Sequence, residues 1–275
     1  MLVKNFKSII KLLLPPIFFN FILKLLQRRN VFRGEFSNWE NAKYFSKGYQ
    51  NKKLLQKIIS SNRICLNNPN LFERDSIIFN NPQYAFALNA CLLFIISKNK
   101  TNKINILDFG GALGTSFRQF QKFTNNTIDL TWTIIEQEEL YKIGIQEFST
   151  EKLIFSTYYL LDNLNINYHA LIFSSVLEFL NNPYEILLSD KFLNINFLLL
   201  DRTPVWLGED DIITNLIASK QITGSYPCTI FSYNKLTSFL KSNNWILFTE
   251  WNAIGEEIHI NNKNGKYIGQ LWKKN

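Results

Sequence analysis

The sequence predicts an α/β protein with a doubly wound, mostly parallel sheet, and two observations lead to this prediction. The chain alternates segments of helical pattern with short runs rich in Ile and Leu: NILDF, TWTIIE, KLIF, ALIFSSV and NFLLLD. These runs do not alternate apolar with polar residues, which is typical of parallel strands covered on both faces. Strand–helix–strand alternation then favours the doubly wound arrangement.

The N-terminal residues 1–35 differ from residues 36–275, which we predict to form a single domain. Residues 9–26 (IIKLLLPPIFFNFILKLL) are apolar, but Pro15 and Pro16 interrupt any helix in mid-span. A bilayer crossing needs about 20 unbroken apolar residues, and no small-residue cleavage site follows the segment. Two interpretations stay open: a membrane-surface anchor whose basic side chains face anionic headgroups, and a pair of short helices packed on the domain.

The elements of the main domain follow in order from residue 36. Residues 38–62 have the apolar spacing of a helix, and residues 84–97 are apolar enough to form a buried helix. The five strand runs come next. Residues 245–251 and 266–272 then predict an antiparallel hairpin, joined by a polar stretch containing Asn264-Gly265, that closes the sheet.

Charge and cysteine content limit the classes of function. The formal net charge is +8, but no basic block interleaved with aromatic residues indicates nucleic-acid binding. The three cysteines lie far apart and suit a reducing cytoplasm, where we expect the protein. The two histidines show no metal-ligand spacing, so we expect no metal site.

The first of the predicted parallel strands ends in a glycine-rich loop, ILDFGGALG. Ligands of open α/β sheets bind at the carboxyl ends of the strands, and glycine lets the backbone approach a ligand closely. A Walker loop would need a lysine after Gly114, where this chain has Thr115. The dinucleotide pattern G-x-G-x-x-G does not fit either, whether it is started at Gly110 or at Gly111. The spacing that fits is D-x-G-x-A-x-G, formed by Asp108, Gly110, Ala112 and Gly114.

This spacing resembles motif I of the class I S-adenosylmethionine (SAM)-dependent methyltransferases, with Ala112 in place of the middle glycine. In TWTIIEQ, Glu136 ends the next strand, where a carboxylate can accept both hydroxyls of a ribose. The run LIFSSVLEFLNNP resembles the motif IV region of the same enzymes. The resemblance implies a seven-stranded, Rossmann-like methyltransferase sheet with a helical N-terminal extension, and SAM as the cofactor.

The resemblance covers nearly the whole chain, and a set of further motifs points to one family among these methyltransferases. The motifs ERDS (residues 73–76), DFGGALG, DRTP (residues 201–204) and SYP (residues 225–227) occur together. This set is similar to a family of bacterial methyltransferases encoded among surface-polysaccharide biosynthesis genes. The resemblance implies methyl transfer to a small-molecule or glycan acceptor, such as a sugar hydroxyl, with or without a phosphate.

The resemblance also assigns cofactor contacts at four strand ends. The residues concerned are Asp108, Gly110, Gly111, Ala112, Gly114, Glu136, Gln137, Ser156, Thr157, Ser174 and Ser175. The glycine loop would line the methionyl group, with Asp108 facing its ammonium. Glu136 would hold the ribose, and residues 155–157 would lie near the adenine. The serine pair at residues 174–175 is explained equally well as a plain strand terminus.

Candidates for catalysis are Glu178, Asp75 and Arg202. Glu178 lies one helical turn past the fourth parallel strand and could face the transferred methyl group, although carboxylates are common at helix starts. Asp75 precedes a predicted helix and could equally be its N-cap. Arg202 follows the fifth strand, where a guanidinium can grip a phosphate or carboxylate of the acceptor, or form a surface ion pair.

Two other functions stay open. A protein with the same fold but no catalytic activity would be a SAM-binding scaffold for glycan assembly. The intact glycine loop and Glu136 argue against a degenerate site of this kind. A nucleotide-sugar oxidoreductase or epimerase is disfavoured by the failed dinucleotide spacing and by the lack of a Tyr-x-x-x-Lys pair.

Overall fold

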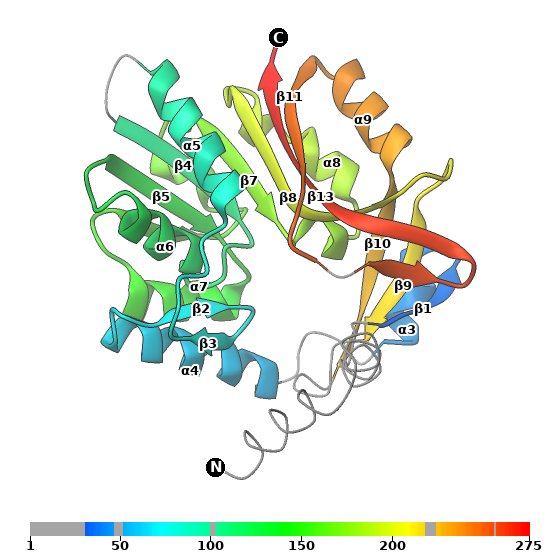
Figure 1. Ribbon diagram of the computed structural model, residues 1–275, viewed down its shortest axis with the longest axis horizontal. Coiled ribbons are helices and arrows are strands. Elements are labelled where there is room, and N and C mark those ends of the chain that lie inside the picture. Colours follow the sequence, from blue (N-terminus) through cyan, green and yellow to red (C-terminus); the bar gives the residue numbers. More distant parts are fainter. Residues whose placement is uncertain (1–30, 47–51, 100–102, 218–223, 256) are drawn as a thin grey trace, which may run out of the picture.

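The centre of the fold is a mixed sheet of eleven described strands. The computed structural model describes residues 31–46, 52–99, 103–217, 224–255 and 257–275. From one edge inward, the parallel part of the sheet consists of β6 (Leu153–Ser156), β5 (Asp129–Ile135), β4 (Lys103–Phe109), β7 (Ala170–Ser174) and β8 (Phe197–Trp206). The mostly parallel sheet predicted from the sequence is confirmed (Figure 1).

Helices cover both faces of this sheet because successive strand residues point to opposite sides. On one face, Ile104 and Ile106 pack with α5 (Phe86–Lys98) and α6 (Thr115–Phe123). On the other face, Leu107 belongs to a second core with α9 (Tyr233–Ser242). The doubly wound arrangement is therefore present, with one apolar core on each side of the sheet.

The C-terminal strands close the sheet antiparallel to β8, as predicted, but the position of the turn differs. β13 (Lys263–Lys274) pairs with β8, and β11 (Trp245–Asn252) pairs with β13. The short β12 (Ile258–Ile260) lies between them in sequence and also pairs with β13. Asn264 and Gly265 consequently lie inside a strand, and the reversal falls at Asn261, which has a φ of 49°.

Further strands extend β8 beyond the predicted seven-stranded sheet. β10 (Ser225–Ser232) runs parallel to the end of β8, and β9 (Ile212–Ile217) and β1 (Val31–Phe36) continue antiparallel from it. β1 crosses the predicted boundary at residue 35, so this part of the expected helical extension is a strand. Residues 1–30, on which the predicted anchor falls, lie outside the described residues.

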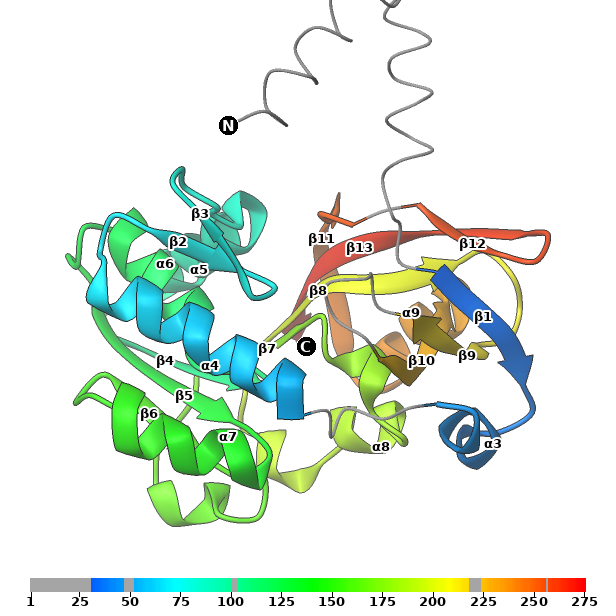
Figure 2. The same cartoon turned by 90° about the horizontal axis from the view of Figure 1, so that it is seen from below.

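The region before the first parallel strand differs most from the prediction. The single helix expected over residues 38–62 is replaced by α3 (Trp39–Tyr44), capped by Asn38, and α4 (Lys52–Asn67). A hairpin of β2 (Phe72–Arg74) and β3 (Ile77–Phe79) follows, where a helix was expected. Figure 2 shows this hairpin over α6, with its turn directed toward β8. Within the described ranges, no helix is long and apolar enough to span a bilayer.

Candidate functional site

The glycine loop joins β4 to α6 through alternate residues with left-handed backbone. Gly110, Ala112 and Gly114 have φ angles of 72°, 50° and 88°. The Gly110 nitrogen donates to the Ile135 carbonyl oxygen at 2.8 Å, which anchors the loop to the end of β5. A Cβ atom on Gly110 would lie 2.4 Å from Cγ2 of Val176, so only glycine fits there.

Glu136 connects the end of β5 to this loop. Its Oε1 accepts from the Ala112 nitrogen and its Oε2 from the Gln137 nitrogen, both at 2.9 Å. Burial raises the pKa of Glu136, and the two backbone hydrogen bonds partly offset that rise. Each carboxylate oxygen keeps a further lone pair with which to accept a ligand hydroxyl. The structure thus brings together two motifs that are separate in the sequence.

Asp108 lies beneath the loop and is only 2% exposed. Its Oδ2 accepts from Nε1 of Trp132 at 3.0 Å, and a Cβ on Gly111 would lie 2.4 Å from the same oxygen. Burial raises the pKa of Asp108 to about 7. The sequence analysis did not identify Trp132 as a partner of Asp108. Trp132 lies on the neighbouring predicted strand, and the parallel pairing of the two strands puts both side chains on the same face of the sheet.

The ends of β6 and β7 lie at the same edge of the sheet. Glu136 donates its backbone N–H to the Ser156 carbonyl at 3.0 Å, and the Ser156 hydroxyl donates to the Thr157 carbonyl at 3.1 Å. At the end of β7, the Ser174 hydroxyl donates to Asp201 Oδ2 at 2.9 Å. The Ser156 and Ser174 hydroxyls are therefore engaged within the protein, while Gln137 is exposed at the start of α7 (Glu138–Ile143).

Glu178 is buried in a single turn of 3-10 helix, η3 (Leu177–Phe179), rather than at the start of a longer helix. Its side chain is 3% exposed, and Oε1 accepts from the Ser175 hydroxyl at 3.2 Å. Among the described residues, no hydrogen-bond partner reaches Oε2. Burial raises the pKa of Glu178 to about 7. A buried carboxylate oxygen without a partner is costly, so it marks a place where a ligand hydroxyl would be stabilised.

Arg202 and Asp75 contact one another across the site. Nη1 of Arg202 lies 2.9 and 3.1 Å from the two carboxylate oxygens of Asp75. Two expectations are corrected here. Asp75 is in the hairpin turn, with a φ of 51°, and is not a helix N-cap. Arg202 lies within β8, which continues to Trp206 because β13 pairs with residues 203–206 on one side and β10 pairs with the last two on the other.

Acidic side chains gather at the carboxyl edge of the sheet, and Asp108 and Glu178 among them are buried. Asp108, Glu136 and Glu178 all have pKa values raised by burial, and Arg202 lowers those of Asp108 and Glu178. Such an edge favours a ligand with positive charge, because a nearby cation stabilises ionised carboxylates. The sulfonium and ammonium of SAM have that charge, and the open backbone of the loop leaves room for a close approach. The residues present therefore fit this cofactor.

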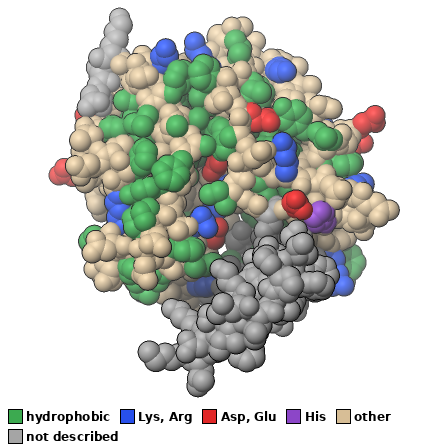
Figure 3. All heavy atoms as spheres, in the orientation of Figure 1, with side chains coloured by type: hydrophobic (Ala, Val, Ile, Leu, Met, Phe, Trp, Pro, Cys, Tyr) green, Lys and Arg blue, Asp and Glu red, His purple; other side chains and the backbone are tan. Residues whose placement is uncertain are grey.

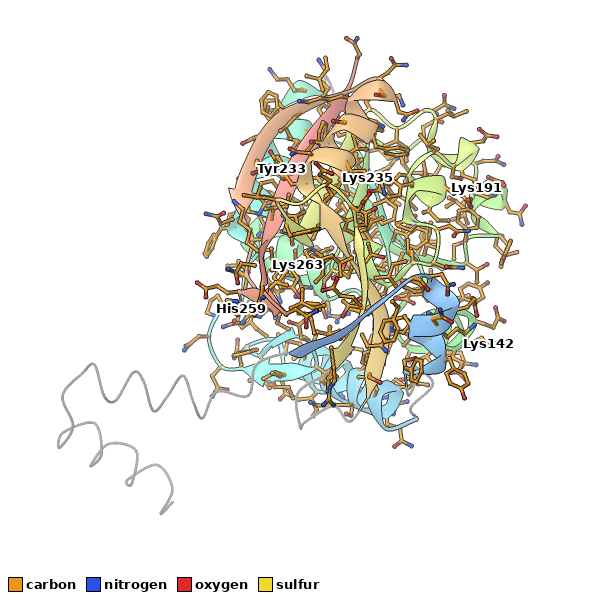
Figure 4. The ribbon with its side chains drawn as sticks, turned by 90° about the vertical axis from the view of Figure 1, so that its right-hand side faces the viewer. Lys142, Lys191, Tyr233, Lys235, His259 and Lys263 are labelled. Atoms are coloured by element: carbon orange, nitrogen blue, oxygen red, sulfur yellow. The ribbon has the colours of Figure 1, made fainter. Side chains whose placement is uncertain are left out.

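The histidines do not join this edge. His169 precedes β7, at the opposite end of the strand, where its Nδ1 accepts from the Asn105 nitrogen at 3.0 Å. His259 lies on β12, near Lys263 at the surface (Figure 4). Among the residues that the structure describes, no three His, Cys, Asp or Glu side chains are grouped as metal ligands. On the face shown in Figure 3, Lys and Arg side chains are scattered singly.

No protein-family model and no curated protein matches the chain. It is similar to the solved N-terminal domain of EvdMO1 with S-adenosylhomocysteine (SAH) bound, at 12% identity and TM-score 0.47, covering 78% of this chain and 96% of that chain. It is also similar to the 1,6-didemethyltoxoflavin-N1-methyltransferase of Burkholderia thailandensis, crystallised with SAH, at 9% identity and TM-score 0.46, covering 88% and 92%. The glycopeptide N-methyltransferase MtfA complexed with SAM aligns at 7% identity and TM-score 0.45, covering 68% and 93%. These similarities are too weak to assign the chain to a family.

Proposed function

We propose that the protein is a SAM-dependent methyltransferase acting on a small molecule. The observation that carries the proposal is the hydrogen bond from the Ala112 nitrogen to Glu136 Oε1. This bond holds Glu136, which we propose accepts the ribose hydroxyls, against the glycine loop at the carboxyl edge of the sheet. Sheets of this kind bind nucleotides at that edge. The motif resemblance and the buried carboxylates at this edge support the same cofactor.

The protein's own residues would bind and orient the cofactor. Glu136 would hold the ribose, the loop from Gly110 to Gly114 would line the methionyl group, and Asp108 would stabilise its ammonium. The ends of β6 and β7, at residues 156–157 and 174–175, would border the adenine and the methionyl group. When bound, SAM supplies an activated methyl group, so the protein's remaining task is to align an acceptor and exclude water.

We propose that the acceptor group is a hydroxyl and that Glu178 takes up its proton. The buried Oε2 of Glu178, which has no hydrogen-bond partner among the described residues, can accept a hydrogen bond from such a group. A pKa raised to about 7 suits a general base near neutral pH. Methyl transfer to oxygen rather than nitrogen is therefore part of the proposal.

The acceptor that we propose is a sugar or an activated glycan intermediate. This part rests on the resemblance to methyltransferases of surface-polysaccharide gene clusters and on Arg202, whose guanidinium retains nitrogens other than Nη1 for a phosphate or carboxylate. Arg202→Lys keeps the charge but loses the planar fork, so it should raise the KM for an anionic acceptor. Peripheral membrane contact through residues 1–30 is part of the same proposal and concerns residues outside the described ones.

Calorimetric titration with SAH and with NAD tests the cofactor. We expect SAH to bind at micromolar concentration and to raise the melting temperature by mass action, and NAD to do neither. Binding of NAD without SAH would overturn the proposal in favour of an oxidoreductase. SAH binding without methyl transfer to any of a panel of sugars and glycan intermediates would instead favour a cofactor-binding scaffold.

A further inference from the structure

The ERDS motif places two carboxylates on one hairpin, and they contact different parts of the molecule. Glu73, on β2, is 6% exposed and accepts from the Ser76 nitrogen at 2.6 Å and from the Thr115 hydroxyl. Asp75, two residues later, is at the turn and pairs with Arg202 on β8. One short hairpin therefore touches both the start of α6 and the strand next to Glu178.

The contact at Glu73 lies directly behind the glycine loop. Thr115 is the first residue of α6 and follows Gly114 immediately. One turn further on, Arg118 donates from Nη1 to the Leu113 carbonyl at 2.6 Å, and Gln119 donates to the Glu73 carbonyl at 2.7 Å. Polar contacts from the hairpin and from α6 therefore bracket Gly114 on both sides.

Packing alone does not fix this junction. A cavity of about 290 Å³ lies beside it, and Glu73, Thr115 and Arg118 are among its lining residues. Burial raises the pKa of Glu73, and the Thr115 hydroxyl and the Ser76 nitrogen offset that rise by hydrogen bonding. Where apolar contact is incomplete, hydrogen bonds to a buried carboxylate determine how the chain is held.

The loop needs such support because of its backbone. Ala112 holds a φ of 50° although it has a Cβ atom, and it lies between two glycines that also have positive φ. Residues in this region persist only where surrounding contacts over-determine them. Glu136 supplies one such contact at Ala112, and the hairpin supplies the other at the junction with α6.

We propose that Glu73 is a positioning residue for the glycine loop, and that the β2–β3 hairpin joins this loop to Arg202 through Asp75. In its meaning for catalysis the inference rests on the proposed function, because the loop is the proposed cofactor site. The structural part of the inference does not depend on the ligand. We expect the glycine loop to become more mobile when the Thr115–Glu73 hydrogen bond is lost. We expect the hairpin that holds Glu73 to loosen when the Asp75–Arg202 pair is lost.

The test compares Thr115→Val with Thr115→Ser in the full chain. The Val variant is nearly isosteric but lacks the hydroxyl, which contacts Glu73 and also lies 3.2 Å from Oδ1 of Asn62. It should weaken SAH binding about tenfold, the effect of one lost buried hydrogen bond. The Ser variant keeps the hydroxyl and should bind SAH as wild type does. Amide hydrogen exchange of the protein without ligand measures the mobility of the loop directly. The amides of residues 110–115 should exchange faster in the Val variant than in wild type, and not in the Ser variant.

The link to Arg202 is tested by Asp75→Asn. We expect it to speed exchange of the same loop amides by about two- to threefold in the wild-type background, and to add nothing in the Thr115→Val background, because coupled contacts are not additive. Unchanged loop exchange in Thr115→Val, or an equal effect of Thr115→Ser, would overturn the positioning role. Full additivity of Asp75→Asn would overturn the link. Failure of wild-type protein to bind SAH would instead contradict the proposed function, and the exchange data would still decide this inference.

Discussion

The Ala112 nitrogen donates to Oε1 of Glu136 at 2.9 Å, although 24 residues separate the two in sequence. The carboxylate that we assign to the ribose is thus also a support of the glycine loop. A substitution at Glu136 changes two things at once, the shape of the loop and the number of oxygens available to a ligand. Predictions for this site have to separate those two effects.

Glu136→Gln separates them in part, because the amide oxygen can still accept from the Ala112 nitrogen, whereas the amide nitrogen can accept neither from the Gln137 nitrogen nor from a ribose hydroxyl. We expect SAH affinity to fall by about tenfold, the cost of a lost charge-assisted hydrogen bond. The melting temperature without ligand should fall only slightly, because the Ala112 contact remains and the exposed Gln137 nitrogen loses its acceptor. Glu138→Gln, at an exposed position two residues later, is the matched control and should bind SAH as wild type does. Equal losses in the two variants would contradict the ribose assignment.

Gly110→Ala should destabilise the protein for a reason that the sequence did not reveal. Its φ of 72° costs an alanine about 1–2 kcal/mol, and the added Cβ would lie 2.4 Å from Val176 Cγ2. The clash is with Val176, the residue directly before η3, and does not involve ligand space alone. The double variant Gly110→Ala/Val176→Ala removes the Cγ2 contact and leaves only the Cβ of residue 176 at 2.9 Å, so it should be more stable than the sum of the single effects predicts. Strict additivity in urea unfolding would show that the clash is relieved in another way.

The sequence predicts those parts of the site that depend on local pattern. Asp108, the glycine loop and Glu136 end buried strands, and parallel pairing of β4 with β5 brings these ends together. The β2–β3 hairpin could not be predicted in this way, since its turn uses Asp75 and Ser76 with positive φ instead of the Asn-Gly or Asp-Gly pair that signals such turns.

The environments of Arg202 and Glu178 also depend on tertiary contacts. β8 continues past Arg202 because two strands that follow in the sequence pair with its end, β13 at residues 203–206 and β10 at residues 205–206. Glu178 has an ordinary position after β7 in the sequence, and its burial comes from the strands packed around η3. Cys228 of β10 is one such neighbour: burial raises the pKa of its thiol, and the charge of Glu178 adds to that rise. Long-range pairing of this kind leaves no local signal.

The stability of the protein should depend on pH through Glu178. Its pKa rises from 4.5 to about 7 on folding, so between these values the folded state holds a proton that the unfolded chain has released. Stability attributable to this group is therefore greatest below pH 4.5, falls as the pH rises toward 7, and is level above that. Each pH unit of the window corresponds to about 1.4 kcal/mol at most.

Glu178→Gln should remove this part of the pH dependence. We expect the variant to gain stability relative to wild type as the pH is raised from 5 to 8, measured by urea unfolding at each pH. Asp108, whose pKa is also raised to about 7, contributes a slope of the same sign in both proteins and cancels in the comparison. Glu185→Gln, exposed on α8 (Pro183–Leu187), is the control. A difference between Glu178→Gln and wild type that is constant with pH would show that Glu178 titrates normally.

The acidic edge should distinguish SAM from SAH, because SAM carries one more positive charge. Asp108 and Glu178 have pKa values of about 7, so each is partly protonated at neutral pH when no ligand is bound. A bound cation stabilises the ionised carboxylates and lowers these pKa values. Binding SAM should therefore release protons to the buffer, and by linkage the ratio of SAM to SAH affinity should rise between pH 6 and pH 8.

Calorimetry in buffers of different ionisation enthalpy measures the released protons, and Glu178→Gln should release fewer while leaving SAH affinity nearly unchanged. A SAM to SAH ratio that does not vary with pH would mean that the sulfonium lies away from these carboxylates, and the placement of the methyl group next to Glu178 would be wrong.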